Sequence, residues 1–433
     1  MTESAAAPAT RKRAVILVGN PANPYSRAIR LGRTLTQEGY DVEIAATYEE
    51  GAPLEQRDGP LTIRRYKPSG IFASMAATYR WSPPASTPSK RPPLTTRVLR
   101  TLRARFVAWF LWPHTVRGWW ATLSKELAPA DLYHSCGTLP IAAAVAARDR
   151  DRRAGRRSHV VLDVIDITME SNNVLGIPPL IRRMLDRRER GWARRADAHT
   201  AVNDVFADKA MARWSLATRP TVVPNYPEPW QPPAAAPDLI RAATGLPAST
   251  RICLFWGRLG PYVGLDEAAE AILQVPDAVL VLLGFGRGWE RSVARDAEPP
   301  FAGRHFTLPA VHPDELPAWV ASADVALCTL PPLSYNQRFT LPNKFLEAMT
   351  AGTPMVLGPD LPTMEALLRE EDLGRVTASM APADIAAAIG SILELPAEDR
   401  AAWRDRIRST ARERYSWPIA AEAYARLIRS LAV

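Results

Sequence analysis

The sequence predicts an α/β protein made of two doubly wound domains that face each other across a cleft. Strand, loop, helix and strand patterns repeat from residue 14 to residue 224 and restart at residue 251. Six prolines between residues 224 and 237 indicate a semi-rigid linker between the two series. The chain of 433 residues is too long for a single ordinary hydrophobic core, and its hydrophobic content of 47% is enough to fold two or three domains. We therefore place the domains at residues 14–227 and 228–414.

Charge is distributed unevenly along the chain. The formal net charge is +9, and residues 1–235 hold 35 Lys and Arg against 21 Asp and Glu, whereas acidic residues outnumber basic ones in the remainder. This asymmetry indicates an anionic partner for the first domain, such as a membrane surface, a lipid phosphate or a nucleic acid. An arginine-rich solvated surface explains the same counts.

Cysteine usage excludes two classes of protein. The three cysteines, Cys136, Cys253 and Cys328, are widely separated and have no C-x-x-C spacing. Neither a disulfide framework nor a zinc site is therefore predicted, and a cytoplasmic location is expected.

The first domain opens with a βαβ unit. An apolar strand at 14–18 precedes a small polar loop at 19–24, a helix at 26–38 and a strand at 41–45. The loop lies at the carboxyl end of the strand, where open parallel sheets bind ligands, so we count Asn20 and Asn23 as ligand candidates. Without a G-x-G-x-x-G motif, no dinucleotide cofactor is indicated. We interpret residues 1–13 as a disordered tail.

Residues 97–125 combine arginines with tryptophans and phenylalanines. Basic, aromatic helices favour a membrane interface, where rings lie at headgroup level and arginines meet anionic lipid. We therefore expect an anionic membrane surface as a partner, with the protein peripheral at the inner face of the membrane. A helix pair packed into its own domain is the alternative. Single-stranded nucleic acid is a third reading that no other feature supports, so nucleic acid is not an expected partner.

The first domain continues with further α/β units. Strands are predicted at 61–67, 131–134, 159–163, 198–202 and 221–224, with helices at 139–147, 179–195 and 205–214. His134 should stand at a strand's carboxyl end, although a lone histidine is more often structural. Asp163 and Asp166 lack the Asp-x-Asp spacing of a metal-bound nucleotide sugar, so no metal site is predicted. Asp166 is counted with His134 on the acceptor side.

The second domain repeats this pattern. Strands are predicted at 251–256, 278–283, 305–308, 325–330 and 355–357, and a helix at 265–273. Glycine-containing turns follow the first two of these strands, at 257–260 and 284–286.

The helix at 342–351 carries the strongest functional signal. Pro342 suits its first position, and Gly352 with Pro354 ends it before an apolar strand. Free N–H groups at the start of a helix bind anions, and Lys344 adds a positive charge there. Glu347 falls about one turn later, where it could accept hydrogen bonds from two sugar hydroxyls. A diphosphate and a pentose fit this arrangement, although an ordinary amphipathic helix with exposed Lys and Glu is the alternative.

The order and spacing of these motifs resemble, along nearly the whole chain, the retaining glycosyltransferases of family 4, whose GT-B fold pairs two Rossmann-like domains. Gly257-Arg258-Leu259 with Gly264-Leu265-Asp266 resembles the block whose arginine contacts the donor diphosphate. The segment 283–286 resembles the Gly-x-Gly near the nucleobase. The segment 341–354 resembles the Leu-Pro-Asn-Lys variant of the donor motif, in which Glu347 would hold the ribose.

The first half and the C-terminus extend the resemblance. The segment 131–137 resembles the strand and histidine near the acceptor, and Asn225-Tyr226-Pro227 resembles the domain junction. Residues 415–433 resemble the helix that crosses back to the N-terminal domain. Two positions depart from the pattern: Val263 replaces a lysine that contacts diphosphate, and Phe339 replaces an acidic residue eight positions before the ribose glutamate.

The resemblance implies transfer of a sugar from a UDP- or GDP-sugar to an acceptor hydroxyl, with retention and without metal or cofactor. The acceptor would be a sugar, a lipid-linked molecule or a small molecule, in cell-surface polysaccharide, glycolipid or natural-product glycoside synthesis. Catalytic roles fall to His134, Arg258, Lys344 and Glu347, and acceptor binding to Asn20, Asn23, His134 and Asp166. The donor-binding residues would be Gly257, Arg258, Gly284, Gly286, Thr340, Leu341, Pro342, Asn343, Lys344 and Glu347.

Two other functions stay open. One is a nucleotide-sugar epimerase or pseudo-sugar coupling enzyme of the same fold. The other is a non-catalytic nucleotide-sugar-binding partner, which the Val263 departure motivates.

Overall fold

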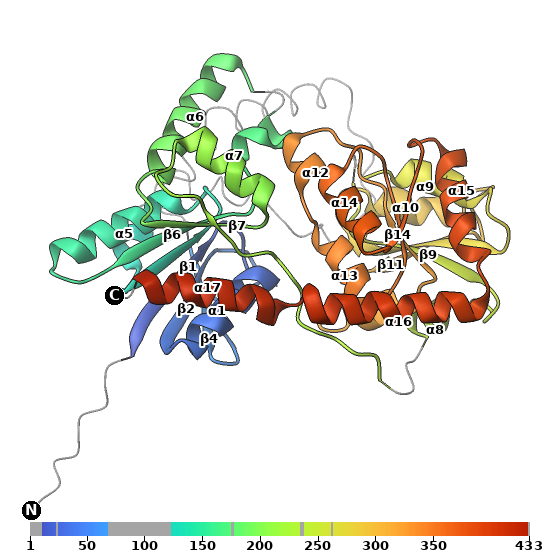
Figure 1. Cartoon of the computed structure of the whole chain (residues 1–433), viewed down its shortest axis with the longest axis horizontal. Helices are drawn as coiled ribbons and strands as arrows, with labels where there is room; N and C mark the ends of the chain where they lie inside the picture. The colour runs from blue at the N-terminus through green and yellow to red at the C-terminus, as the bar shows by residue number, and fades with distance from the viewer. Residues whose placement is uncertain are drawn as a thin grey trace, which may run out of the picture.

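The computed structural model describes residues 11–22, 25–67, 123–174, 177–233, 238–260 and 263–431. Figure 1 shows two α/β units side by side, the first in blue to green and the second in yellow to orange. Each unit is built on its own sheet, of eight strands in the first and six in the second. The predicted fold of two Rossmann-like α/β domains is confirmed.

The first sheet has the strand order β3-β4-β2-β1-β5-β6-β7-β8. All neighbours are parallel except β3 and β4, and this antiparallel edge strand was not predicted. Apolar side chains pack against both faces of the sheet. The strands are β1 (Lys12–Val18), β2 (Tyr40–Thr47), β3 (Glu55–Asp58), β4 (Leu61–Tyr66), β5 (Leu132–Cys136), β6 (His159–Val164), β7 (Ala198–Ala201) and β8 (Thr221–Val222).

Helices connect these strands as the sequence pattern predicts. Asn203 caps α7 by accepting a hydrogen bond from the amide of Phe206 at 2.8 Å. The helices are α1 (Ser26–Gln37), α5 (Ile141–Arg153), α6 (Pro179–Ala193) and α7 (Asp204–Trp214), with short 3₁₀ turns η2 (Thr168–Glu170) and η3 (Asn172–Val174).

The second sheet is wholly parallel, in the order β11-β10-β9-β12-β13-β14. Its winding reverses between β9 and β12, and such a switch point is where open α/β sheets bind ligands. The strands are β9 (Arg251–Arg258), β10 (Ala278–Phe285), β11 (His305–Pro309), β12 (Val325–Cys328), β13 (Met355–Leu357) and β14 (Gly374–Val376). The helices are α8 (Leu239–Thr244), α9 (Leu265–Ile272), α10 (Trp289–Arg295), α11 (Leu316–Ala321), α12 (Tyr335–Phe339), α13 (Asn343–Ala351), α14 (Pro362–Glu370), α15 (Pro382–Leu393) and α16 (Ala397–Arg414).

The last helix, α17 (Trp417–Leu431), returns to the first domain. Figure 1 shows α16 and α17 in red, following one another from the second unit across to the first. Trp417, Tyr424 and Ile428 of α17 are buried in the core of the first domain. Arg429 makes a bidentate ion pair with Glu38, which follows α1. The C-terminal helix therefore packs on the first domain.

Several element boundaries differ from the predicted ones, among them those of β5, β9 and β1. Ser135 and Cys136 belong to β5, and Gly257 with Arg258 ends β9, whereas the predicted strands end at residues 134 and 256. Parallel pairing with β10 extends to Arg258 and accounts for the longer strand. Residues 12 and 13, predicted as part of the tail, are the first residues of β1.

Some predictions concern residues outside the described ranges. These are residues 1–10 of the tail, Asn23, and residues 97–122 of the basic aromatic segment. Leu123, at the described end of that segment, is fully buried. Among the residues that the structure describes, no helix is both long and apolar enough to span a membrane.

Candidate functional site

Helix α13 begins at the switch point of the second sheet. Pro342 has extended backbone angles (φ −70°, ψ 155°) and precedes the helix, so the first helical residue is Asn343 rather than the predicted Pro342. The amides of Phe345 and Leu346 both reach the carbonyl of Pro342. The preceding amides of Asn343 and Lys344 have no acceptor within the helix, as expected for a first turn. They are therefore available to an anion.

Lys344 lies against the sheet beneath this helix start. Its ammonium is 3.6 Å from the ring centroid of Phe255 in β9, a cation–π arrangement. Burial lowers the pKa of Lys344 to about 8, although the neighbouring Cys328 and Glu347 act in the opposite direction. The structure therefore places a titratable positive charge between the ends of β9 and β12.

Glu347 lies one turn further along α13. Its Oε2 accepts a hydrogen bond from the indole Nε1 of Trp256 at 2.7 Å. Burial raises the pKa of the Glu347 carboxyl, while that hydrogen bond and the charges of Arg30 and Lys344 oppose the rise. Trp256 uses one carboxylate oxygen and fixes the orientation of the group, which leaves Oε1 with capacity to accept from a ligand.

The ends of β9 and β10 approach closely beside this helix. Gly257 pairs with Gly284 across the two strands, and a Cβ on Gly284 would lie 2.2 Å from the carbonyl oxygen of Gly257. Gly286 has φ +117°, a conformation that only glycine adopts readily. Side chains at Gly284 and Gly286 would therefore clash with the neighbouring backbone, and glycine allows the close approach. Arg258 is exposed here, with its Cγ 3.3 Å from the position of a Cβ on Gly286.

Loops at the carboxyl ends of both sheets contact each other around α12. Asn336 accepts from the amide of Ile167 at 3.3 Å and donates to its carbonyl at 3.1 Å. Asn203 donates to the carbonyl of Phe339 at 2.8 Å. The predicted donor-binding residues Thr340, Leu341, Pro342 and Asn343 form the segment between α12 and the first turn of α13. The candidate site therefore lies at the junction of the two domains.

His134 occupies a different environment from the predicted one. It lies inside β5 and has no exposed surface. Its Nδ1 is 3.0 Å from the hydroxyl of Tyr424 in α17, and its Nε2 is 3.7 Å from Oδ2 of Asp163. Because the imidazole is enclosed by these groups, it has no direct access to an acceptor in this structure. Its position fits a structural role, which the sequence left open for a lone histidine.

Asp163 forms a buried ion pair with Arg27 that organises this end of the first sheet. The guanidinium donates to both carboxylate oxygens, at 2.6 and 2.7 Å, and Thr200 donates to Oδ1 at 2.7 Å. Burial by itself favours the neutral carboxyl, but the charge and hydrogen bonds of Arg27 outweigh it and hold the pKa of Asp163 well below its usual range.

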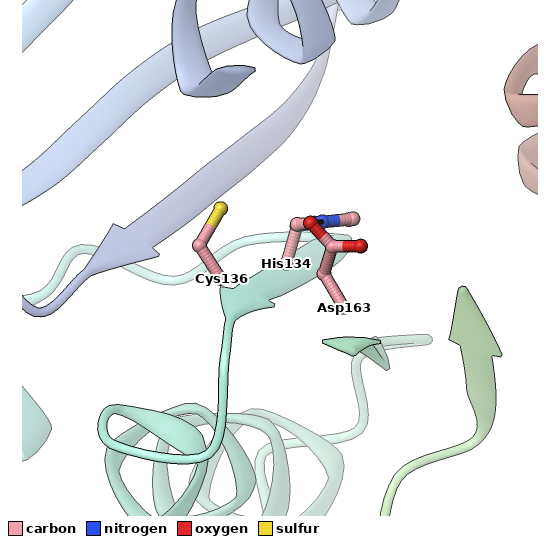
Figure 2. Close-up of side chains that lie close together, drawn as sticks. All are labelled: His134, Cys136 and Asp163. Atoms are coloured by element: carbon pink, nitrogen blue, oxygen red, sulfur yellow. Dashed lines mark ion pairs between the residues drawn. The ribbon is translucent and has the colours of Figure 1, made fainter. Parts of the chain in front are cut away.

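The ligand atoms of His134, Cys136 and Asp163 lie within 4.8 Å of one another. Figure 2 shows the histidine and the carboxylate close together with the cysteine beside them. The donor set does not fit a metal, because Arg27 already occupies both oxygens of Asp163 and a cation would meet its positive charge. Burial also raises the pKa of the Cys136 thiol well above its usual value, which disfavours the thiolate. We assign the cluster as a polar network of the core.

Asn20 and Asp166, two other predicted acceptor-binding residues, lie in different environments. Asn20 is part of a local turn, since its side chain accepts from the amide of Ala22 at 2.8 Å. Asp166 follows β6 and is exposed, and it precedes Ile167, which Asn336 of the second domain holds. Although the residue is exposed overall, desolvation of its carboxyl by the surrounding protein raises the pKa of Asp166 to about 6. Asp166 therefore lies at the domain junction, next to α12.

Sequence reasoning missed Trp256 and Arg30. The role of Trp256 could not be predicted, because in the sequence it is one more apolar residue of a buried strand. Arg30 is one of three arginines on α1, and no spacing in the sequence marks its hydrogen bond to Asn225 in the connection between the domains. Asn225, in contrast, lay within the predicted junction motif.

One family model matches part of the chain. Residues 250–395, which include α13, match the family model described as Glycosyl transferases group 1. No curated protein matches the sequence significantly.

Solved structures resemble the whole chain. Sucrose-phosphate synthase from Thermosynechococcus elongatus has a TM-score of 0.67 at 19% identity, over 98% of this chain and 99% of that chain. HepE from Anabaena, in complex with UDP-glucose, has a TM-score of 0.63 at 15% identity, over 97% of this chain and 100% of that chain. Trehalose 6-phosphate synthase from Burkholderia multivorans has a TM-score of 0.61 at 15% identity, over 98% and 97%. At these identities the likeness shows the GT-B fold.

Proposed function

We propose that the protein transfers a glycosyl group from a nucleotide sugar to an acceptor hydroxyl, with retention of the anomeric configuration. The observation that carries this proposal is the first half of α13 at the switch point of the second sheet, where free amides, Lys344 and Glu347 lie together. The match of residues 250–395 to Glycosyl transferases group 1 supports it. The UDP-glucose bound to HepE favours a uridine nucleotide as the first donor to test.

In this proposal each residue has a separate task. Glu347, oriented by Trp256, accepts hydrogen bonds from the ribose hydroxyls. The amides of α13 and Lys344 stabilise the diphosphate, which gains negative charge as the bond to the sugar breaks. Arg258, at the exposed end of β9, is a second cation for the same group. Preorganised donors of this kind are typically worth 10²- to 10³-fold each in turnover.

The position of the Val263 departure bears on this assignment. Val263 precedes Gly264, the residue that caps the N-terminus of α9, and family 4 enzymes are expected to supply a lysine at the position of Val263. Lys344 is the positive charge that the structure provides beside the same strand ends. We therefore propose that Lys344 compensates for the missing lysine.

The acceptor side of the proposal rests on Asp166 and on helix α6. Asp166 lies at the domain junction without a described partner, and its carboxylate would accept a hydrogen bond from an acceptor hydroxyl. In α6, Leu180 and Met184 stand one turn apart and are 79% and 48% exposed. Arg183 and Arg187 are exposed on the same helix, also one turn apart. This basic, apolar surface suits an anionic membrane and hence a lipid-linked acceptor.

The test is donor turnover with the purified protein. UDP- and GDP-sugars are supplied with lipid-linked, sugar and small-molecule acceptors, and release of the nucleoside diphosphate and the configuration of the product are measured. Transfer with retention supports the proposal, and inversion contradicts its mechanism. Conversion of the donor without any acceptor would instead indicate an epimerase. Tight nucleotide binding with no product from any acceptor would indicate a non-catalytic binding partner.

A further inference from the structure

Three side chains form a chain of hydrogen bonds from the first domain to the first residue of α13. Arg30 in α1 donates through Nη2 to Oδ1 of Asn225 at 2.6 Å. Asn225, in the connection between the domains, donates through Nδ2 to Oδ1 of Asn343 at 2.5 Å. Helix α13, the proposed donor-binding helix, is therefore linked to the first domain by Arg30 and Asn225, which have no role in the reaction proposed above.

The chemistry of the groups fixes the direction of this chain. A guanidinium has donors only, so the oxygen of Asn225 must face Arg30. The amide nitrogen of Asn225 then faces Asn343, whose oxygen must accept from it. The Nδ2 group of Asn343 has no partner among the residues that the structure describes, and both of its hydrogens are left to donate elsewhere.

Arg30 is well held in the position that this chain requires. Its side chain is only 8% exposed, and its guanidinium carbon lies 5.4 Å from the ring centroid of Trp417. Burial lowers its pKa to about 10, so it remains charged at neutral pH.

We infer that Arg30 is a positioning residue that acts through Asn225 to orient Asn343, so that the Asn343 amide donates to a phosphate oxygen of the bound nucleoside diphosphate. This inference rests on the proposed function. If Asn343 were turned over, it would present its carbonyl oxygen, which repels an anion beside the free amides of α13. Correct orientation therefore depends on contact between the two domains, because Arg30 belongs to the first and Asn343 to the second.

The experiment measures binding of UDP and GDP to the full-length protein by titration calorimetry. Arg30→Met and Asn225→Leu are each expected to weaken binding about tenfold, because Asn343 is then free to turn over. Asn343→Leu should weaken it by at least as much. Arg33→Met is the matched control: Arg33 lies on the same helix, pairs with Asp58 and is half-exposed, so binding should stay within about twofold.

Combining variants separates positioning from a structural role. If Arg30 acts through Asn343, adding Arg30→Met to Asn343→Leu should weaken binding no further, because the group it orients is gone. Independent, additive losses would overturn the inference, as would unchanged affinity in both Arg30→Met and Asn225→Leu. Thermal unfolding of each variant identifies any that is not folded, and Asn225→Leu leaves α1 itself unaltered.

The outcomes also separate this inference from the function on which it rests. If the wild-type protein binds no nucleoside diphosphate, the proposed function and the inference fail together. If the wild type binds and the variants bind equally well, the positioning role fails while the donor site stands.

Discussion

Replacing Lys344 with methionine is expected to stabilise the unliganded protein while weakening nucleoside diphosphate binding. The pKa of Lys344 is lowered from 10.5 to about 8 by burial. Each pKa unit corresponds to about 1.4 kcal/mol, so keeping this ammonium charged in the fold costs roughly 3 kcal/mol. The contact with Phe255 returns about 1–2 kcal/mol of that cost, and methionine loses it. A net stabilisation of about 1–2 kcal/mol remains.

The lowered pKa of Lys344 fixes the direction in which the stability of the protein changes with pH. Between about pH 8 and pH 10.5 the unfolded chain holds the lysine proton while the folded protein releases it. Stability of the wild type should therefore rise with pH across this window, and the advantage of Lys344→Met should shrink. Bound diphosphate favours the charged lysine, so binding to the wild type should weaken as pH rises above 8.

Urea denaturation at pH 7 and pH 9.5 measures the change in stability, and calorimetric titration with UDP and GDP measures the change in nucleotide binding. Binding to Lys344→Met should be weaker by on the order of 100-fold, the loss of one strong charged contact. Lys67→Met is the control, because Lys67 is an exposed lysine over the ring of Tyr48, far in sequence from the site. A Lys344→Met protein that is clearly less stable than the wild type at pH 7, or that binds diphosphates as tightly, would refute this reasoning.

Three further predictions concern other parts of the molecule. Glu347→Gln should weaken nucleotide binding by roughly 1.5–3 kcal/mol. Because burial raises the pKa of the Glu347 carboxyl, nucleotide binding by the wild type should weaken on acidification at a higher pH than an ordinary glutamate would give. Calorimetry from pH 5 to 8 tests both. Asp163→Asn should destabilise the fold by about 3–5 kcal/mol at pH 7 because Arg27 stays buried without its partner. The carboxylate's lowered pKa stabilises the wild type above about pH 4 and is lost on acidification, so the gap in urea denaturation should narrow as pH falls towards 3. Replacing Leu180 and Arg183 in α6 with serine should reduce co-sedimentation of the protein with anionic vesicles. The control Met211→Ser, which changes an exposed methionine on α7, should bind the vesicles as the wild type does. Equal binding by all variants would exclude α6 as the membrane-binding surface.

The architecture was predictable because the two series of apolar strands are punctuated by clear turn and linker residues. Strand β13 and helix α13 were predicted to within one residue, since Gly352 and the flanking prolines mark their limits. The edge strand β3 escaped because its sequence is entirely polar, and only its pairing with β4 makes it a strand.

The site was predictable where chemistry is local and not where it depends on distant contacts. Lys344 and Glu347 are one helical turn apart, so the helix alone brings them together. The burial of His134 depends on Tyr424, 290 residues later in the chain. The tie from Arg30 to α13 likewise depends on Asn225, which is distant in sequence from both. No periodicity in the sequence reports such contacts.

The central claim is that the start of α13 binds the diphosphate of a nucleotide sugar while Glu347 binds its ribose. A crystal structure of the protein with UDP or GDP tests this most directly. The account predicts diphosphate oxygens within hydrogen-bond distance of the amides of Asn343 and Lys344, and ribose hydroxyls on the Glu347 carboxylate. A nucleotide bound elsewhere, or bound here with its base toward Glu347 and its phosphates away from α13, would contradict it.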